Sequence, residues 1–98
     1  MQTAYIHLIK HALNQGHTVS VWDGEEWQVK RSTSLHAITE AVKSVEEATL
    51  HIRDQDGKVV TWALVSAYGL QPDETVVDYG DNEWTNAWFE GYTQAIDA

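Results

Sequence analysis

The chain has 98 residues, with 15 acidic and 6 basic side chains, and its formal net charge is −9 with the histidines neutral. This charge excludes a protein that binds nucleic acid mainly by neutralising phosphates, and it disfavours an anionic membrane surface. Since the sequence has no cysteine, it excludes disulfides and every cysteine-based metal or thiolate site. The length predicts a single domain over residues 1–98.

The first residues do not resemble a signal peptide, because His7, Lys10 and His11 interrupt the apolar positions. No apolar run approaches the length of about 18 residues that a membrane-spanning helix needs. We therefore expect a cytoplasmic protein that makes no membrane contact.

The chain begins with a predicted amphipathic helix over residues 3–14, in which the apolar side chains recur on one broad face. Gly16 follows at the place of a C-terminal cap. His7 and His11 fall on the polar face, so we expect both histidines to be exposed.

Residues 17–31 predict a β-hairpin with its turn at Asp23-Gly24. We expect the loop to have an odd number of residues, because such a loop places Trp27 on the same face as the valines of the first strand. Trp22 would then point to the opposite face of the sheet.

A second helix is predicted over residues 32–45, capped by Ser32 or Ser34. A second hairpin follows over residues 48–66, with a loop of two or four residues around Asp56-Gly57. Its second strand is apolar on both sides, as in a strand with both faces covered. The predicted register places Val59 on the same sheet face as Leu50 and Ile52, which we term the inner face. It places Trp62 on the opposite face.

The last part contains a loop over residues 67–80, with a short strand or turn at residues 75–77, and a helix from Asp81 or Asn82 to about Ile96. The order α-β-β-α-β-β-α predicts an α+β fold with three helices and a mostly antiparallel sheet of about four strands. We expect the first two helices on one sheet face. The last helix should cover the other face or pack at its edge; otherwise an apolar patch is left uncovered.

The sequence predicts no metal site, no cofactor and no catalytic residue. His7 and His11 share a helix face, but Leu8 breaks the HExxH pattern. The segment 54–57 (DQDG) shares its first residues with a calcium loop, yet no glutamate closes it, and a hairpin turn explains it. No GxSxG motif or glycine-rich phosphate loop is present. His51 is expected to be a half-buried sheet residue.

An acidic, aromatic segment over residues 73–92 contains six of the 15 acidic residues and no basic one. Interleaved carboxylates and aromatic rings can imitate the charge of a nucleic-acid backbone and occupy a basic groove. The predicted protein-binding residues are Asp73, Glu74, Asp78, Tyr79, Asp81, Glu83 and Glu90, with Trp22 and Trp62 on the second sheet face. The competing interpretation places Trp84, Trp88 and Tyr92 in the core and leaves the acids as solvated surface.

We therefore expect a non-enzymatic interaction protein whose partner is a basic, nucleic-acid-handling protein. A small-molecule or carbohydrate-binding module, a minimal enzyme and a structural homodimer remain alternatives. The size, acidity and tryptophan content resemble, in a general way, accessory proteins of bacteriophages and mobile elements, some of which inhibit host enzymes. That resemblance rests on no particular residue.

Overall fold

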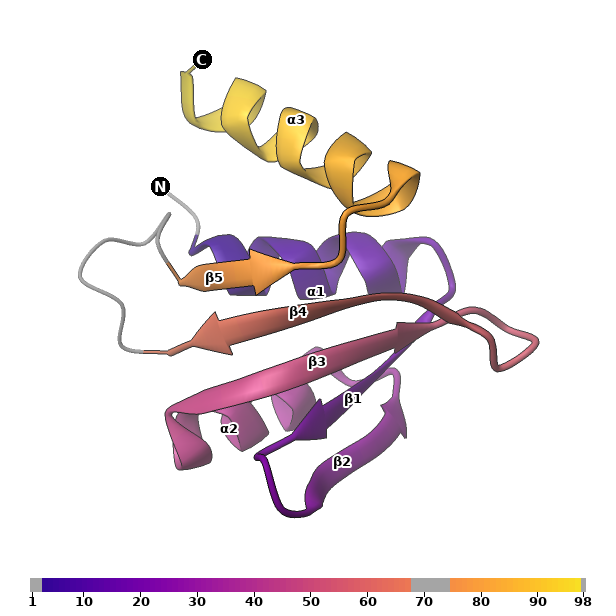
Figure 1. The fold of residues 1–98 in the computed structure, drawn as a ribbon, viewed down its shortest axis with the longest axis vertical. Helices are drawn as coiled ribbons and strands as arrows, with labels where there is room; N and C mark the ends of the chain where they lie inside the picture. Colours follow the sequence, from indigo (N-terminus) through magenta and orange to yellow (C-terminus); the bar gives the residue numbers. More distant parts are fainter. Residues whose placement is uncertain (1–2, 68–74, 98) are drawn as a thin grey trace.

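The computed structural model describes residues 3–67 and 75–97, with side chains as far as residue 93. The elements are α1 (Ala4–Asn14), β1 (Thr18–Trp22), β2 (Trp27–Ser32), α2 (Leu35–Val45), β3 (Glu47–Arg53), β4 (Val59–Ser66), β5 (Val76–Tyr79) and α3 (Glu83–Asp97). The strands form one antiparallel sheet in the order β2-β1-β3-β4-β5 (Figure 1). The α+β class and the three helices are confirmed, but the sheet has five strands rather than about four.

The additional strand is β5, which pairs with β4 through Ala63 opposite Tyr79 and Leu64 opposite Asp78. The sequence indicated only a short strand or turn here, because the hairpin signals of the other strands are absent. Asp73 and Glu74 lie outside the described residues.

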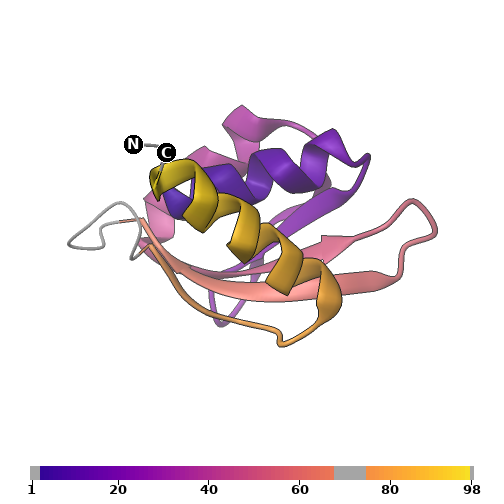
Figure 2. The same ribbon diagram turned by 90° about the horizontal axis from the view of Figure 1, so that it is seen from above.

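All three helices lie on the same side of the sheet (Figure 2). The Thr85 hydroxyl of α3 is 2.5 Å from the Thr61 hydroxyl of β4, and the Trp88 indole donates a hydrogen bond to Nδ1 of His7 in α1 (2.9 Å). The shared face of α1 and α2 is therefore confirmed. Of the two predicted positions of α3, the opposite face is wrong and the sheet edge is correct, because α3 packs beside α1 at the β4–β5 edge of the sheet.

The core fills the space between the helices and the inner face of the sheet. Its fully buried apolar side chains include Leu8, Ile9, Val19, Val21, Ile38, Val42, Leu50, Ile52, Ala63 and Val65. Burying a side chain of this size contributes about 1.5–3 kcal/mol before conformational entropy is counted. These residues alternate along the strands, so the opposite sheet face receives the other set of side chains.

The helix ends agree with the predicted caps. Oγ of Ser34 accepts a hydrogen bond from the Ala37 amide (3.2 Å), and Oδ1 of Asn82 accepts one from the Thr85 amide (2.9 Å). Gly16 ends α1 with a φ of 79°, a conformation that side chains with a Cβ rarely adopt. Local sequence therefore determines these three helix ends.

The β1–β2 hairpin departs from the prediction at its loop. Residues 23–26 form a four-residue loop, so Trp27 pairs with Trp22 and not with the valine face. A register shift in the next residues then brings Val29 opposite Val21. The odd-loop prediction is therefore wrong for Trp27 and correct for Val29, because a β-bulge changes the parity within the strand.

The β3–β4 turn is one residue longer than predicted, since Arg53 pairs with Val59 across residues 54–58. Oδ1 of Asp54 accepts hydrogen bonds from the amides of Asp56 (2.9 Å) and Lys58 (3.0 Å). A turn therefore accounts for the DQDG segment. The associated register shift leaves Val59 50% exposed, so its predicted inner position is wrong.

Candidate functional site

The sheet side opposite the helices, which we term the open face, carries Trp22, Trp27, His51, Trp62 and Leu64. The ring centroids of Trp22 and Trp27 are 4.9 Å apart, and those of Trp27 and His51 are 5.0 Å apart, both edge to face. Trp62 is 38% exposed. No described helix covers this aromatic surface, which extends over four strands; exposed apolar surface of this kind marks interaction sites in soluble proteins.

His51 lies in the middle of the open face, where it pairs with Trp62 across β3 and β4. Partial burial lowers its pKa below the usual value, and the positive charge of Arg53 lowers it further. The imidazole is therefore neutral at neutral pH. It lies between Trp27, which its ring contacts, and Trp62, its partner in the sheet.

The border of the open face at β5 is acidic. Asp78 is exposed and pairs with Leu64, and its Oδ1 accepts a hydrogen bond from the Tyr79 amide (2.9 Å). Asp81 is also exposed and follows Gly80, whose amide donates to the Trp62 carbonyl (3.0 Å). These carboxylates therefore lie along the edge at which Trp62 and Leu64 are accessible.

Gly80 has a specific packing role beside Trp62. A Cβ at this position would lie 3.0 Å from the indole Nε1 and 3.1 Å from Oγ1 of Thr61. Glycine thus allows the chain leaving β5 to pass directly against the tryptophan ring.

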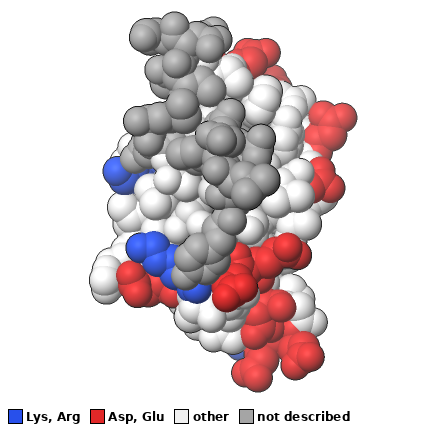
Figure 3. All heavy atoms as spheres, turned by 90° about the vertical axis from the view of Figure 1, so that its left-hand side faces the viewer, with Lys and Arg blue, Asp and Glu red and all other residues white. Residues whose placement is uncertain are grey.

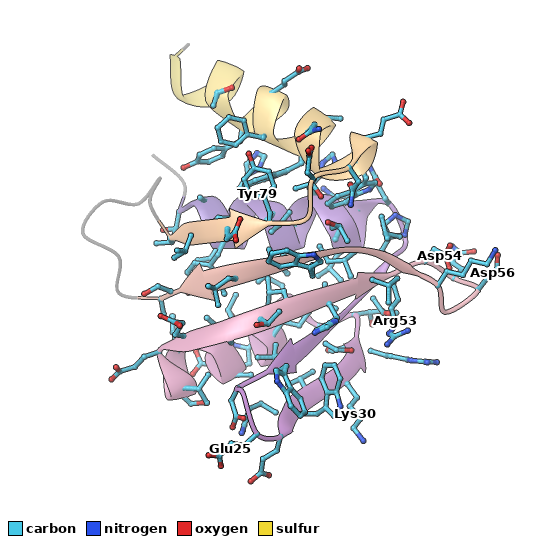
Figure 4. All side chains as sticks on the ribbon, viewed as in Figure 1. Glu25, Lys30, Arg53, Asp54, Asp56 and Tyr79 are labelled. Atoms are coloured by element: carbon cyan, nitrogen blue, oxygen red, sulfur yellow. The ribbon has the colours of Figure 1, made fainter. Side chains whose placement is uncertain are left out.

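The remaining predicted binding residues do not join this surface. Tyr79 is half-buried, with its ring stacked on Phe89 at 5.8 Å and edge-on to Trp88 at 6.5 Å. Figure 4 shows its side chain directed towards α3. Glu83 is exposed in the first turn of α3, and Glu90 is exposed further along that helix, in the helical layer. The structure thus groups Trp22, Trp62 and Asp78 on one face and separates Tyr79 and Glu90 from it.

The histidines of α1 are half-buried against α3, so the prediction that His7 and His11 are exposed is wrong. His7 accepts the hydrogen bond from Trp88 described above. The Gln15 amide donates to Nε2 of His11 (3.0 Å) and accepts from the Trp84 indole (2.6 Å). Burial is the main cause that lowers the pKa of both histidines, and nearby positive groups lower it further. Sequence reasoning missed this because the polar stripe of α1 faces a second helix rather than water.

No group of three potential ligand side chains among residues 3–67 and 75–97 is arranged to hold a metal ion. Within the same residues, no helix has the length and apolar character needed to cross a membrane.

Basic side chains gather at the corner of the open face where β1 begins and β2 and β3 end. A hollow of about 210 Å³ there is lined by Ser20, Trp27, Lys30, Arg31 and Arg53. In Figure 4, Lys30 and Arg53 lie at this corner, with Asp54 and Asp56 in the turn beyond and Glu25 in the loop below. The sequence contained no signal for this grouping, because it depends on the register shifts of β2.

The charge distribution is uneven elsewhere too. In Figure 3, most of the visible carboxylates lie along one flank of the molecule, and the visible Lys and Arg groups lie mainly on the other. On the open face itself, the acidic border lies at β5 and the basic corner at β2 and β3.

Comparison of the chain with protein-family models, with curated proteins and with solved structures finds no significant match.

Proposed function

We propose that the protein is a non-enzymatic binding module that docks another protein on its open face. The observation that carries this proposal is the position of Trp22, Trp27 and Trp62 on the sheet side that no described helix covers. Tryptophan is among the side chains that contribute most to binding when a partner excludes water from it. A role limited to solubility would not require three of these large apolar rings on one surface.

The expected partner presents a basic segment. The acidic border at Asp78 and Asp81 lies beside the accessible rings, and the net charge of −9 favours association with positively charged proteins. In this arrangement, Trp62 and Leu64 supply the apolar contact, and the carboxylates orient the partner along β4 and β5.

The test compares capture of partners from a lysate by the unaltered protein and by matched variants. Trp22→Ala with Trp62→Ala removes two rings of the open face, whereas Phe89→Ala removes a ring of similar exposure from α3, where Phe89 is 42% exposed. We expect the same protein to be enriched by the unaltered chain and by Phe89→Ala but lost with the double tryptophan variant. The captured protein is then purified and its affinity measured directly.

The charge component is tested with Asp78→Asn combined with Asp81→Asn. This variant should weaken binding by about tenfold at low salt and by less at high salt, because exposed charges are screened over about 10 Å at 0.1 M salt. Capture that is insensitive to the tryptophan variants would overturn the proposal. A concentration-dependent dimer mass, abolished by Trp62→Ala, would instead identify a second copy of the chain as the occupant.

A further inference from the structure

The basic corner differs from the rest of the open face because three basic residues line one hollow. Lys30 and Arg31 are sequence neighbours, and neighbouring side chains of a regular strand point to opposite faces. Arg31 has a φ of 48°, in the left-handed region that residues with a side chain seldom adopt. This bulge is what allows both side chains to line the same hollow as Arg53.

The floor of the hollow holds this unusual backbone in place. Oγ of Ser20 accepts a hydrogen bond from the Arg31 amide (2.8 Å), and Ser20 is only 3% exposed. Since a hydroxyl has a proton of its own to donate, Ser20 still offers a donor inside the hollow. No acceptor for that proton is found among the described residues.

The three cations have no neutralising carboxylate among the residues that the structure describes. None of Lys30, Arg31 and Arg53 forms an ion pair with a carboxylate of the described residues. Arg53 donates from Nη1 to the Gly57 carbonyl (2.9 Å), which fixes the guanidinium at the β3–β4 turn. The Arg31 guanidinium lies beside the same turn, with Nη1 3.7 Å from the position of a Gly57 Cβ.

We infer that this hollow binds the phosphate group of a small molecule. Two guanidinium groups, one ammonium group and one hydroxyl donor suit a phosphate monoester, which carries about two negative charges near neutral pH. The Trp27 indole forms the apolar wall, against which a planar part of the same ligand can pack.

The surroundings limit the ligand to a small one. Asp54 and Asp56 line the adjoining hollow of about 280 Å³ on one side of Arg31. Glu25 and Glu26 are exposed in the β1–β2 loop, and Figure 4 shows Glu25 on the other side of Lys30 from the β3–β4 turn. A polyanion such as single-stranded nucleic acid would extend past these carboxylates and be repelled, whereas a mononucleotide would not.

The experiment follows the backbone and indole NMR signals of ¹⁵N-labelled protein during titration with inorganic phosphate, AMP and adenosine at constant ionic strength set by chloride. We expect saturable shifts at Ser20, Trp27 and Arg31 with phosphate, tighter binding of AMP, and no binding of adenosine. An absence of saturable shifts with phosphate and AMP would overturn the inference. Adenosine binding as tightly as AMP would overturn the assignment of the phosphate group.

Matched variants locate the site. Arg31→Asn removes one cation but keeps a residue that tolerates the left-handed conformation, so the bulge should persist. It should weaken AMP binding by about tenfold, as expected for a lost charge-assisted contact. Lys43→Gln removes an equal charge from the exposed side of α2 and should leave the affinity unchanged. Equal losses in the two variants would overturn the site.

A final titration separates the ligand classes. A short single-stranded oligonucleotide should bind more weakly than AMP, and tighter binding would overturn the small-ligand inference. This experiment is independent of partner docking, because it uses the isolated protein and Arg31→Asn leaves Trp22 and Trp62 intact.

Discussion

The five tryptophans divide into two groups with opposite surroundings. Trp88 is 2% exposed, and both Trp88 and Trp84 donate their indole N–H groups to side chains of the α1 region, as expected for rings that hold α3 on the domain. Trp22, Trp27 and Trp62 lie on the open face, and no hydrogen bond from their indole N–H groups is found within the described residues. The same residue type thus stabilises the fold on one sheet face and remains available to a ligand on the other.

The division of the tryptophans between the two sheet faces explains why a chain of this size contains five of them. Helix α3 lies on the same side as α1 and α2, so the tryptophans of that layer complete a single core. No described helix or strand covers the second sheet face, although its strands carry large apolar side chains. We expect substitutions on the two faces to separate stability from binding.

The largest expected difference comes from replacing one tryptophan of each group. Trp88→Ala should reduce the free energy of unfolding by about 3–5 kcal/mol, because it leaves a cavity between α1, α3 and the sheet. Trp62→Ala should reduce it by about 1 kcal/mol or less, since the ring is 38% exposed. Urea unfolding followed by circular dichroism measures both values. Similar losses would show that the two groups do not differ in structural role.

A smaller effect is expected at the contact between α3 and β4. Thr85→Val removes one hydroxyl of the buried Thr61–Thr85 pair and leaves the other without its partner, at a cost of about 1–3 kcal/mol. Thr93→Val, near the end of α3, is the control and should change stability by about 0.5 kcal/mol or less. The double variant Thr61→Val with Thr85→Val should recover part of the loss. If Thr85→Val, Thr93→Val and the double variant have the same free energy of unfolding, the Thr61–Thr85 pair does not anchor α3.

The smallest effect concerns pH on the helical side. Because the pKa of His7 is lower in the folded chain, the unfolded chain binds more protons below its usual pKa of about 6.5. The stability is therefore complete above that pH and declines as the pH falls towards the folded pKa. His7→Asn keeps an acceptor for Trp88 but cannot titrate, so its urea midpoint should decline less between about pH 7.5 and pH 5.5.

The control for this pH effect is His36→Asn, because His36 is exposed on α2. This variant also replaces one histidine with asparagine, but away from the contact between α1 and α3. Its urea midpoint should therefore decline with falling pH as it does in the unaltered chain. If His7→Asn shows the same decline as His36→Asn, His7 is not the group that couples α1 to α3.

Much of the fold could be predicted from local sequence. The caps at Ser34 and Asn82, the turn at Gly57 and the alternation in β3 depend only on neighbouring residues, and the structure agrees with them. The position of α3 could be predicted only as one of two alternatives, the sheet edge or the opposite face, because its apolar residues suit both. Only the packed structure shows that Trp88 reaches His7 across 81 positions of the sequence.

The candidate site was predictable only in part. Trp22 and Trp62 were placed on a second sheet face from strand alternation, and the structure has them there. Trp27 was missed because the β-bulge changes the parity of β2, and the basic corner was missed because it depends on the left-handed Arg31. Tyr79 was predicted as an exposed anchor, whereas it packs between β5 and α3.

The most direct test of the division between the two tryptophan groups is the response of the five indole N–H signals to the purified partner. With ¹⁵N-labelled protein, we expect the signals of Trp22, Trp27 and Trp62 to shift or broaden on binding, while those of Trp84 and Trp88 keep their positions. Changes confined to Trp84 and Trp88 would contradict the assignment of the open face as the binding surface and would place the partner on α3.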